Sequence, residues 1–230
     1  MTPATTYDLE TGDVRTLNQR LHDLREENCE TPWRILNPKG AHALACGLSV
    51  PVRVEVNGHA GYYCAGMNQR AEVRIRGNCG VGVAENMMSG LVRVDGQASQ
   101  SAGASAHGGL LVIEGSASAR CGISMKGVDI VVRGSVGHMS AFMGQAGNLV
   151  ICGDAGEALG DSLYEARIFV RGRVAGLGAD CIEKNMSDSD HSELKELLGR
   201  SGVDVPTDGF RRYGSARKLY RFDVDHADQY

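Results

Sequence analysis

One pattern recurs at a constant interval through the middle of this 230-residue chain, and it sharply limits the possible folds. At every nineteenth position stands a glycine that is preceded, two and four positions earlier, by branched aliphatic residues. The seven glycines are Gly58, Gly77, Gly96, Gly115, Gly134, Gly153 and Gly172. The aliphatic pairs are Val54 and Val56, Val73 and Ile75, Val92 and Val94, Leu111 and Ile113, Ile130 and Val132, Leu149 and Ile151, and Ile168 and Val170. Because residues two apart in a strand face the same side, each repeat predicts one short strand with a buried face.

The rest of each repeat keeps the same register. Apolar, mostly small residues stand two positions after each glycine, and alanine or glycine stands seven positions after it, which indicates a narrow interior. The 31 glycines of the chain indicate tight turns repeated many times. One repeat cannot bury its own strand face, but stacked repeats can pair their strands in parallel. The pattern predicts an all-β fold, a right-handed parallel β-helix of about seven turns over residues 52–180.

Two other folds fit the pattern less well. A left-handed solenoid of hexapeptide repeats would need an aliphatic residue at every sixth position, whereas this chain has one aliphatic pair per repeat. The strands of a β-sandwich with glycine turns would not keep a constant spacing. The regularity of the repeat therefore favours the β-helix.

Residues 1–51 are expected to form a leader and cap before the solenoid. Residues 13–27 carry Val14, Leu17, Leu21 and Leu24 at helical spacing, which predicts an amphipathic helix. Residues 40–50 are interpreted as a degenerate first turn, since terminal repeats are often atypical.

Residues 181–230 are expected to form a helix and an extended docking arm. A capping box over residues 190–193 predicts a helix of about ten residues that ends near Gly199. From Pro206 onward the chain is charged and contains aromatic residues. A disordered tail is the alternative, but the aromatic residues favour docking.

Composition excludes several classes of protein. The net charge of −4 does not suggest a nucleic acid or an anionic membrane as a partner. The N-terminus lacks the apolar segment of a secretory signal, and no stretch is long and apolar enough to span a membrane. We therefore expect a cytoplasmic protein whose seven cysteines are free thiols.

No pattern of catalytic, cofactor-binding or metal-binding residues is evident. No CxxC pair, HExxH motif or P-loop occurs, and the seven histidines share no common spacing. The loop methionines are expected to fill the core. These are Met67, Met87, Met88, Met125, Met139 and Met143.

The residue between the two buried aliphatics of each strand should point outward. Along the seven repeats it is Glu55, Arg74, Arg93, Val112, Val131, Val150 and Phe169. The last four would form an apolar row, and exposed apolar patches usually mark a contact. Either another chain or the C-terminal arm of the same chain could cover it. The candidate interface residues are Val112, Val131, Val150 and Phe169 of the row and Phe210, Tyr213, Tyr220 and Phe222 of the arm.

The repeat resembles the GXGXG domain of glutamate synthase. The glycine pattern of that family appears intact as Gly153, Gly156 and Gly160, with a near copy at Gly58, Gly61 and Ala65. The resemblance covers roughly residues 35–180, and a chain of this size with its own leader and arm looks most like the β-helix subunit of N-methylglutamate synthase.

The resemblance implies a non-catalytic scaffold subunit in a hetero-oligomer. Its partners would be a glutamine-amidotransferase-like chain and a glutamate-synthase-like chain, with FMN and an iron–sulfur cluster in the latter and no cofactor in this one. The assembled enzyme would convert methylamine and L-glutamate into N-methyl-L-glutamate and ammonia. One alternative is a β-helix subunit of formylmethanofuran dehydrogenase or of the related formyltransferase/hydrolase complex. The other is a stand-alone β-helix enzyme acting on carbohydrate, which would need a carboxylate groove that the repeat register does not provide.

Overall fold

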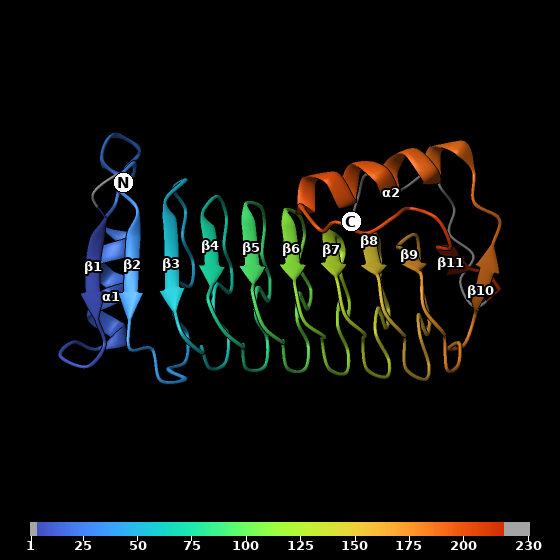
Figure 1. The fold of residues 1–230 in the computed structure, drawn as a ribbon, viewed down its shortest axis with the longest axis horizontal. Helices are drawn as coiled ribbons and strands as arrows, with labels where there is room; N and C mark the ends of the chain where they lie inside the picture. The colour runs from blue at the N-terminus through green and yellow to red at the C-terminus, as the bar shows by residue number, and fades with distance from the viewer. Residues whose placement is uncertain (1–3, 219–230) are drawn as a thin grey trace.

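A computed structural model describes residues 4–218, and within them the strands form one 11-stranded sheet along a solenoid (Figure 1). The strands are β1 (Thr5–Asp8), β2 (Trp33–Leu36), β3 (Arg53–Asn57), β4 (Glu72–Ile75), β5 (Leu91–Val94), β6 (Leu110–Ile113), β7 (Lys126–Val132), β8 (Ala146–Ile151), β9 (Arg167–Val170), β10 (Cys181–Lys184) and β11 (Arg211–Ser215). The helices of this region are α1 (Val14–His22), α2 (Asp188–Ser201) and a short 3-10 helix (Glu26–Asn28). The predicted all-β solenoid of about seven turns is confirmed.

Strands β3 to β9 pair in parallel with the predicted register. Val54 lies opposite Val73, Val56 lies opposite Ile75, and the later strands keep the same sequence offset. Both aliphatics of every strand are buried, at an exposed fraction of 2% or less. A second parallel ladder joins the residues two positions after each glycine. The repeat therefore determines both walls of the solenoid.

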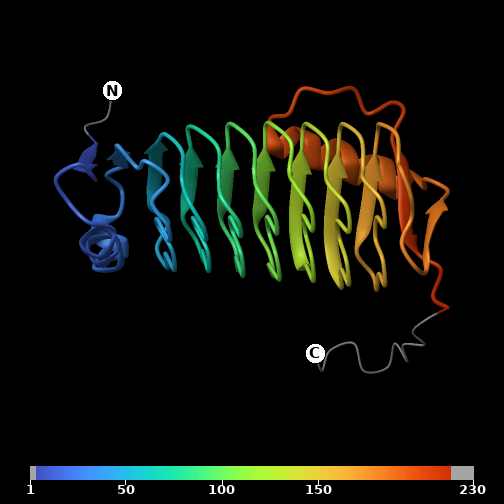
Figure 2. The same cartoon turned by 90° about the horizontal axis from the view of Figure 1, so that it is seen from below.

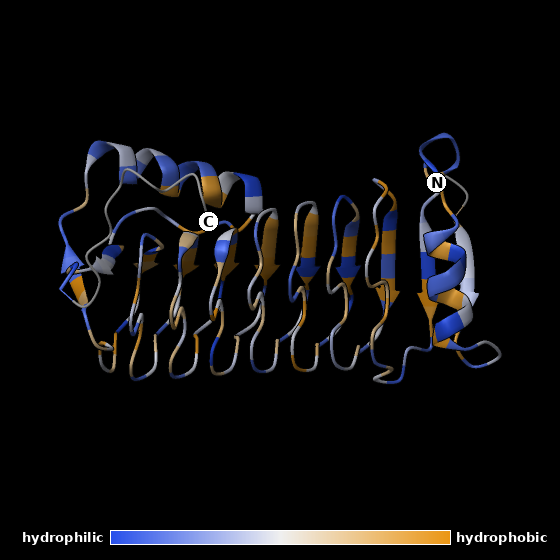
Figure 3. Cartoon of the chain, turned by 180° about the vertical axis from the view of Figure 1, so that it is seen from behind, coloured by the Kyte–Doolittle hydropathy of each residue, from blue (hydrophilic) through white to orange (hydrophobic). Residues whose placement is uncertain are grey.

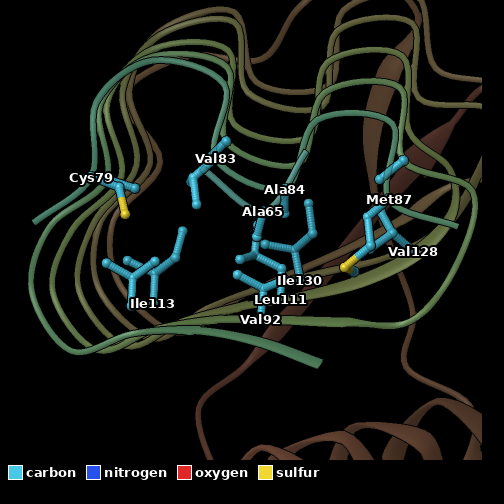
Figure 4. Close-up of a cluster of buried hydrophobic side chains, with 14 of the residues drawn as sticks. Ala65, Cys79, Val83, Ala84, Met87, Val92, Leu111, Ile113, Val128 and Ile130 are labelled. Atoms are coloured by element: carbon cyan, nitrogen blue, oxygen red, sulfur yellow. The ribbon is translucent and has the colours of Figure 1, made fainter. Parts of the chain in front are cut away.

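The interior is narrow at the seventh position after each repeat glycine, which lies opposite the strands and has a left-handed backbone in six of the seven turns. In Figure 4, Leu111 and Ile130 point from the strands toward Ala65 and Ala84 on the opposite wall. The φ angles at this position, which is the seventh after the repeat glycine, include +55° at Ala65, +57° at Ala84 and +68° at Gly103. A Cβ on Gly103 would lie only 2.7 Å from Ile130 Cδ1. Small residues are therefore needed here for the packing, whereas the left-handed backbone does not require them, since Tyr63 and Met67 also adopt it.

The repeat glycines form a stacked column. The amide of Gly115 donates a hydrogen bond to the carbonyl oxygen of Gly96 at 2.9 Å, and the amide of Gly134 donates likewise to Gly115. A Cβ on Gly115 would lie 2.6 Å from the Gly96 oxygen. Of the seven repeat glycines, only Gly58 has a positive φ. We expected these glycines to serve tight turns. They are instead required because successive backbones approach each other closely.

A ladder of polar side chains runs beside the glycine column. In five of the seven repeats, the residue after the glycine accepts a hydrogen bond from a backbone amide one turn later. Asn78 Oδ1 accepts from the Gln97 amide at 2.8 Å, and Ser135 Oγ accepts from the Asp154 amide at 2.9 Å. These bonds satisfy amides at the corner of the solenoid. The ladder could not be predicted from the repeat because its residue type varies from turn to turn.

Two strands that the repeat did not predict extend the N-terminal end. Strand β2 pairs in parallel with β3, but its register partners Trp33 and Val54 are farther apart in sequence than the partners of the later strands. Strand β1 pairs in parallel with β2. The intervening residues 40–50 stack on the next turn, as in the hydrogen bond from the Ala43 amide to the Tyr62 carbonyl at 2.7 Å.

Helix α1 is shorter than the predicted segment 13–27. Asp13 is its N-cap and accepts a hydrogen bond from the Thr16 amide. Leu17 and Leu21 are buried against the first strands, as the helical spacing predicted. The helix ends at Asp23, and a 3-10 turn follows.

Helix α2 begins earlier and ends later than predicted. The side chain of Ser187 accepts a hydrogen bond from the Asp190 amide, and the Asp190 carboxylate accepts one from the Ser187 amide. The capping box therefore starts at Ser187, so the predicted start at residue 190 is wrong. The helix continues through Gly199 to Gly202, whose left-handed backbone forms the C-cap. Figure 2 shows α2 lying across the later strands.

The segment expected to be an extended arm contributes a strand to the sheet. Strand β11 pairs antiparallel with both β9 and β10, which places Arg212 opposite Phe169. The Tyr213 side chain is 2% exposed and joins the core of the solenoid. Within residues 4–218, the helices are too short or too polar to cross a membrane.

Candidate functional site on the outer face of the sheet

The outer face of the sheet has a charged half and an apolar half. The central outward row changes from Arg34, Glu55, Arg74 and Arg93 on β2 to β5 to Val112, Val131, Val150 and Phe169 on β6 to β9. We call the second set the apolar ladder. Figure 3 shows the change, because β6 is hydrophobic along its length whereas β3 alternates. Two different surfaces therefore lie side by side on one sheet.

The apolar ladder is covered by the C-terminal part of the same chain. All four of its side chains are fully buried. They pack against Leu194, Leu197 and Leu198 of α2 and against Val203 and Phe210 after the helix. Of the two covers that the sequence left open, the structure shows the chain's own, and it is mainly α2.

The predicted interface residues thus separate into three groups. Phe210 lies over the apolar ladder, as expected for a docking arm, whereas Tyr213 lies inside the solenoid. Tyr220 and Phe222 lie outside the described residues. The ladder and the arm therefore do not form one surface that is open to a partner.

Charged groups fix the start of α2 to the sheet. Arg167 on β9 pairs with Glu193, and its Nη1 lies 3.8 Å from Asp190 Oδ1. Arg212 Nε lies 3.1 Å from the same oxygen, in an ion pair whose angle does not make a hydrogen bond. Burial raises the pKa of Asp190. Hydrogen bonds from Ser187 and the charges of both arginines lower it by more, so the pKa lies below its usual value. Asp190 is therefore an ionised link between α2 and the last strands.

The end of α2 coincides with the end of the apolar ladder. Arg200 Nη1 lies 3.2 Å from Asp129 Oδ2 on β7. Arg93 on β5 donates a hydrogen bond to the Ser201 carbonyl oxygen and pairs with Glu114. A cation at a helix C-terminus is favourable because of the helix dipole. Helix α2 therefore stops where the outward row becomes charged.

The outward side chains of β2 to β4 remain accessible beyond that point. We call Arg34, Arg53, Glu55, Glu72, Arg74 and Arg76 the open face. Their side chains line a depression of about 240 Å³ together with Ala4, Pro32, Trp33 and Val54. The sequence indicated that this half is charged but not that it is hollowed.

Ion pairs organise part of the open face. Glu55 accepts a hydrogen bond from Arg76 Nη2 at 2.7 Å, and its carboxylate lies 3.6 Å from Arg34 Nε. Asp95 accepts a hydrogen bond from Arg74 Nε at 3.0 Å. These pairs are half-exposed, so each contributes little to stability. They instead hold the arginines in a fixed arrangement.

A second exposed patch lies on the loop side of the early turns. Its side chains are about half exposed and comprise Tyr62, Tyr63, Met67 and Met88. The expectation that the loop methionines fill the core is confirmed for Met87 and Met125, which are buried, and is wrong for Met67 and Met88.

Three of the cysteines and two of the histidines have roles in the fold. Burial raises the pKa of Cys121 and of Cys181 to about 12, and that of Cys152 to about 11, so these thiols are protonated at neutral pH. The rings of His42 and His59 each accept a hydrogen bond from a backbone amide of the following turn at 2.9 Å. In residues 4–218, no three His, Cys, Asp or Glu side chains are grouped to hold a metal ion.

Comparison with known proteins identifies a near full-length relative. The chain is 58% identical over 224 residues to Protein GlxC of Rhizobium meliloti (strain 1021), and the match covers 97% of this chain and 98% of the relative. No protein-family model matches the sequence. No solved structure matches it either.

Proposed function

Because this chain belongs to the family of Protein GlxC, we propose that it is a non-catalytic scaffold subunit of a glutamate-synthase-like enzyme built from separate chains. The proposal combines the family with the resemblance of the repeat to the GXGXG domain of glutamate synthase. In this role the chain holds an amidotransferase-like subunit and a synthase subunit together. It also borders the passage for ammonia or methylamine between their sites.

The observation that carries the proposal is that the GXGXG glycines serve the backbone. Gly153 belongs to the stacked column, where its amide donates to the Gly134 carbonyl oxygen at 2.9 Å. A Cβ on Gly156 would lie 2.8 Å from the carbonyl carbon of Gly137, and Gly160 has a φ of +64°. The residues that define the resemblance thus allow the turns to stack, and this supports an architectural role.

The unbroken stack also suits a spacer. Parallel pairing runs without interruption from β2 to β9. At roughly 4.8 Å for each strand-to-strand step, this part of the rod is about 34 Å long. Because each turn is hydrogen-bonded to the next, the stack can hold two bound partners at a fixed separation.

For the reaction, we propose that of N-methylglutamate synthase. The complex would form N-methyl-L-glutamate and ammonia from methylamine and L-glutamate. FMN and an iron–sulfur cluster would be bound by the synthase partner, and this chain would contribute no residue to either.

Co-expression tests the proposal. The chain should be produced together with amidotransferase-like and flavin-binding chains from the same organism, and purified through a tag on this chain alone. We expect a stable complex of all three, with flavin absorbance and methylamine-dependent formation of N-methylglutamate. The isolated chain should show no flavin absorbance.

Two results would overturn this function. One is failure of the untagged chains to co-purify. The other is stable association with pterin-linked subunits instead, which would favour the formylmethanofuran dehydrogenase alternative.

A further inference from the structure

Two arginines occupy the same register position near opposite ends of the outer face. Arg53 and Arg167 each stand five positions before a repeat glycine and begin β3 and β9. Arg167 is paired with Glu193 and lies close to Asp190, both on α2. The Arg53 side chain is exposed and makes no ion pair or hydrogen bond within residues 4–218, although its backbone pairs in the sheet. The charge of Arg167 is thus paired by an acidic helix that lies on the sheet, whereas the charge of Arg53 is not paired.

The surroundings of Arg53 carry a surplus of positive charge. Four arginines and two glutamates line the depression, on a chain whose overall net charge is −4. Arg34 and Arg76 share the carboxylate of Glu55, and Arg76 and Arg74 share that of Asp95, which leaves Arg53 as the unpaired cation of the four. A local positive surface on an acidic protein attracts and orients acidic partners.

The central row of the open face indicates how an occupant would differ from α2. Helix α2 places leucines on the apolar ladder, whereas the same row on β2 to β4 is Arg34, Glu55 and Arg74. An apolar segment would bury these charges without partners, which is costly. An acidic, polar segment would instead bring carboxylates to the arginines of the open face, which either share a carboxylate with another arginine or have no carboxylate partner.

We propose that the open face is the docking surface for an acidic segment of a partner subunit, laid across β2 to β4 as α2 is laid across β6 to β9. Carboxylates of that segment pair with Arg53 and Arg34, and a basic residue of the segment meets Glu72, which lies opposite Arg53 in the register. The proposal rests on the scaffold function above, because it names the face through which the scaffold holds one of its partners.

Charge reversal on the open face provides the test. Arg53→Glu and Arg34→Glu change exposed side chains, but each places a carboxylate opposite Glu72 or Glu55, so a small fall in melting temperature with one folded transition is expected for the isolated chain. The matched control is Lys195→Glu, which makes a similar reversal at an exposed position on α2. Binding of each variant to the amidotransferase-like and flavin-binding chains, added separately, is measured by titration at low and at high salt.

We expect Arg53→Glu to weaken binding of one partner chain by about tenfold or more at low salt, with Lys195→Glu unaffected. Wild-type binding should weaken as salt increases, and the difference between wild type and Arg53→Glu should shrink. Equal binding by all variants would overturn this inference and leave the scaffold function intact. No binding by the wild-type chain would overturn both.

Two further results would assign the face to another occupant and overturn the inference. If Arg53→Glu changes the oligomeric state of the isolated chain, a second copy covers the face. If ending the chain at Lys218 strengthens partner binding, and Arg53→Glu does so as well, residues 219–230 of the same chain cover it.

Discussion

Two classes of small residue meet different demands in every turn. In the stacked column, the carbonyl of the preceding turn occupies the space that a Cβ would need, as at Gly115, so glycine alone fits. At the seventh position after the column glycine, the narrow interior is the constraint, and a methyl group still fits at Ala65, Ala84 and Ala141. The left-handed backbone does not set this limit, because Tyr63 and Met139 also adopt it. This explains why the first position is always glycine and the second is either glycine or alanine.

The glycine column leads to a prediction at the residue scale. Gly115→Ala should destabilise the chain by about 2 kcal/mol, because the new methyl group would push against a backbone oxygen that has little freedom to move. The control is Gly199→Ala in α2, where a Cβ would meet nothing within 4 Å. It should stabilise the helix by up to about 1 kcal/mol. Urea unfolding curves measure both changes, and equal effects would contradict the packing explanation.

At the scale of the element, α2 completes the outer half of the core. Its apolar face packs on the apolar ladder, and charged contacts fix its start around Asp190 and its end at Arg200 and Ser201, so its position depends strongly on the four ladder residues. A helix of 14 residues with an apolar face is marginal when isolated in water.

Val131→Asp should therefore detach α2 from the sheet. The carboxylate would be buried between Val112 and Val150 with no cation placed to pair with it, at a cost of about 3 kcal/mol or more. Hydrogen exchange should show loss of protection in α2 while β3 to β5 remain protected. Val131→Ala is the control, since it removes volume without charge and should leave α2 in place. Retained protection in α2 of Val131→Asp would be inconsistent with this account.

The elements differ in how far the sequence could predict them. Strands β3 to β9 were predictable because their aliphatic pairs recur at a constant interval. Strand β2 was missed because the longer loop before Val54 breaks that interval, although Trp33 and Ile35 bury the same face. The cover of the apolar ladder was left open because its partners, such as Leu197, are far away in sequence. From the sequence, the open face could be recognised only as a group of charged residues. Its depression could not be predicted, because it depends on which strands α2 leaves uncovered.

At the scale of the whole molecule, the length of the rod is set by the number of turns. A second copy of residues 58–76 placed after Arg76 should fold in register and lengthen the rod by about 4.8 Å, because it repeats every packing position. A scrambled insertion of the same composition should instead lower the melting temperature. Small-angle scattering and thermal melts distinguish the two. In the assembled enzyme proposed above, the lengthened chain should still bind its partners but couple their activities less efficiently. Unchanged coupling would argue against a spacing role.

The charged edge strand at the C-terminal end has a consequence for self-association. A stack of parallel rungs with open ends is a template on which further copies could add and grow into filaments. Here the stack ends with β11 and then β10, paired antiparallel, and β10 carries Glu183 and Lys184 at the edge. Because two antiparallel pairings restore the direction of the stack, it is the charged side chains of β10 that would oppose the next rung of a second copy. The same sheet that repeats so regularly inside the molecule is thus protected against polymerisation at this end, and its length is fixed by the chain rather than by concentration.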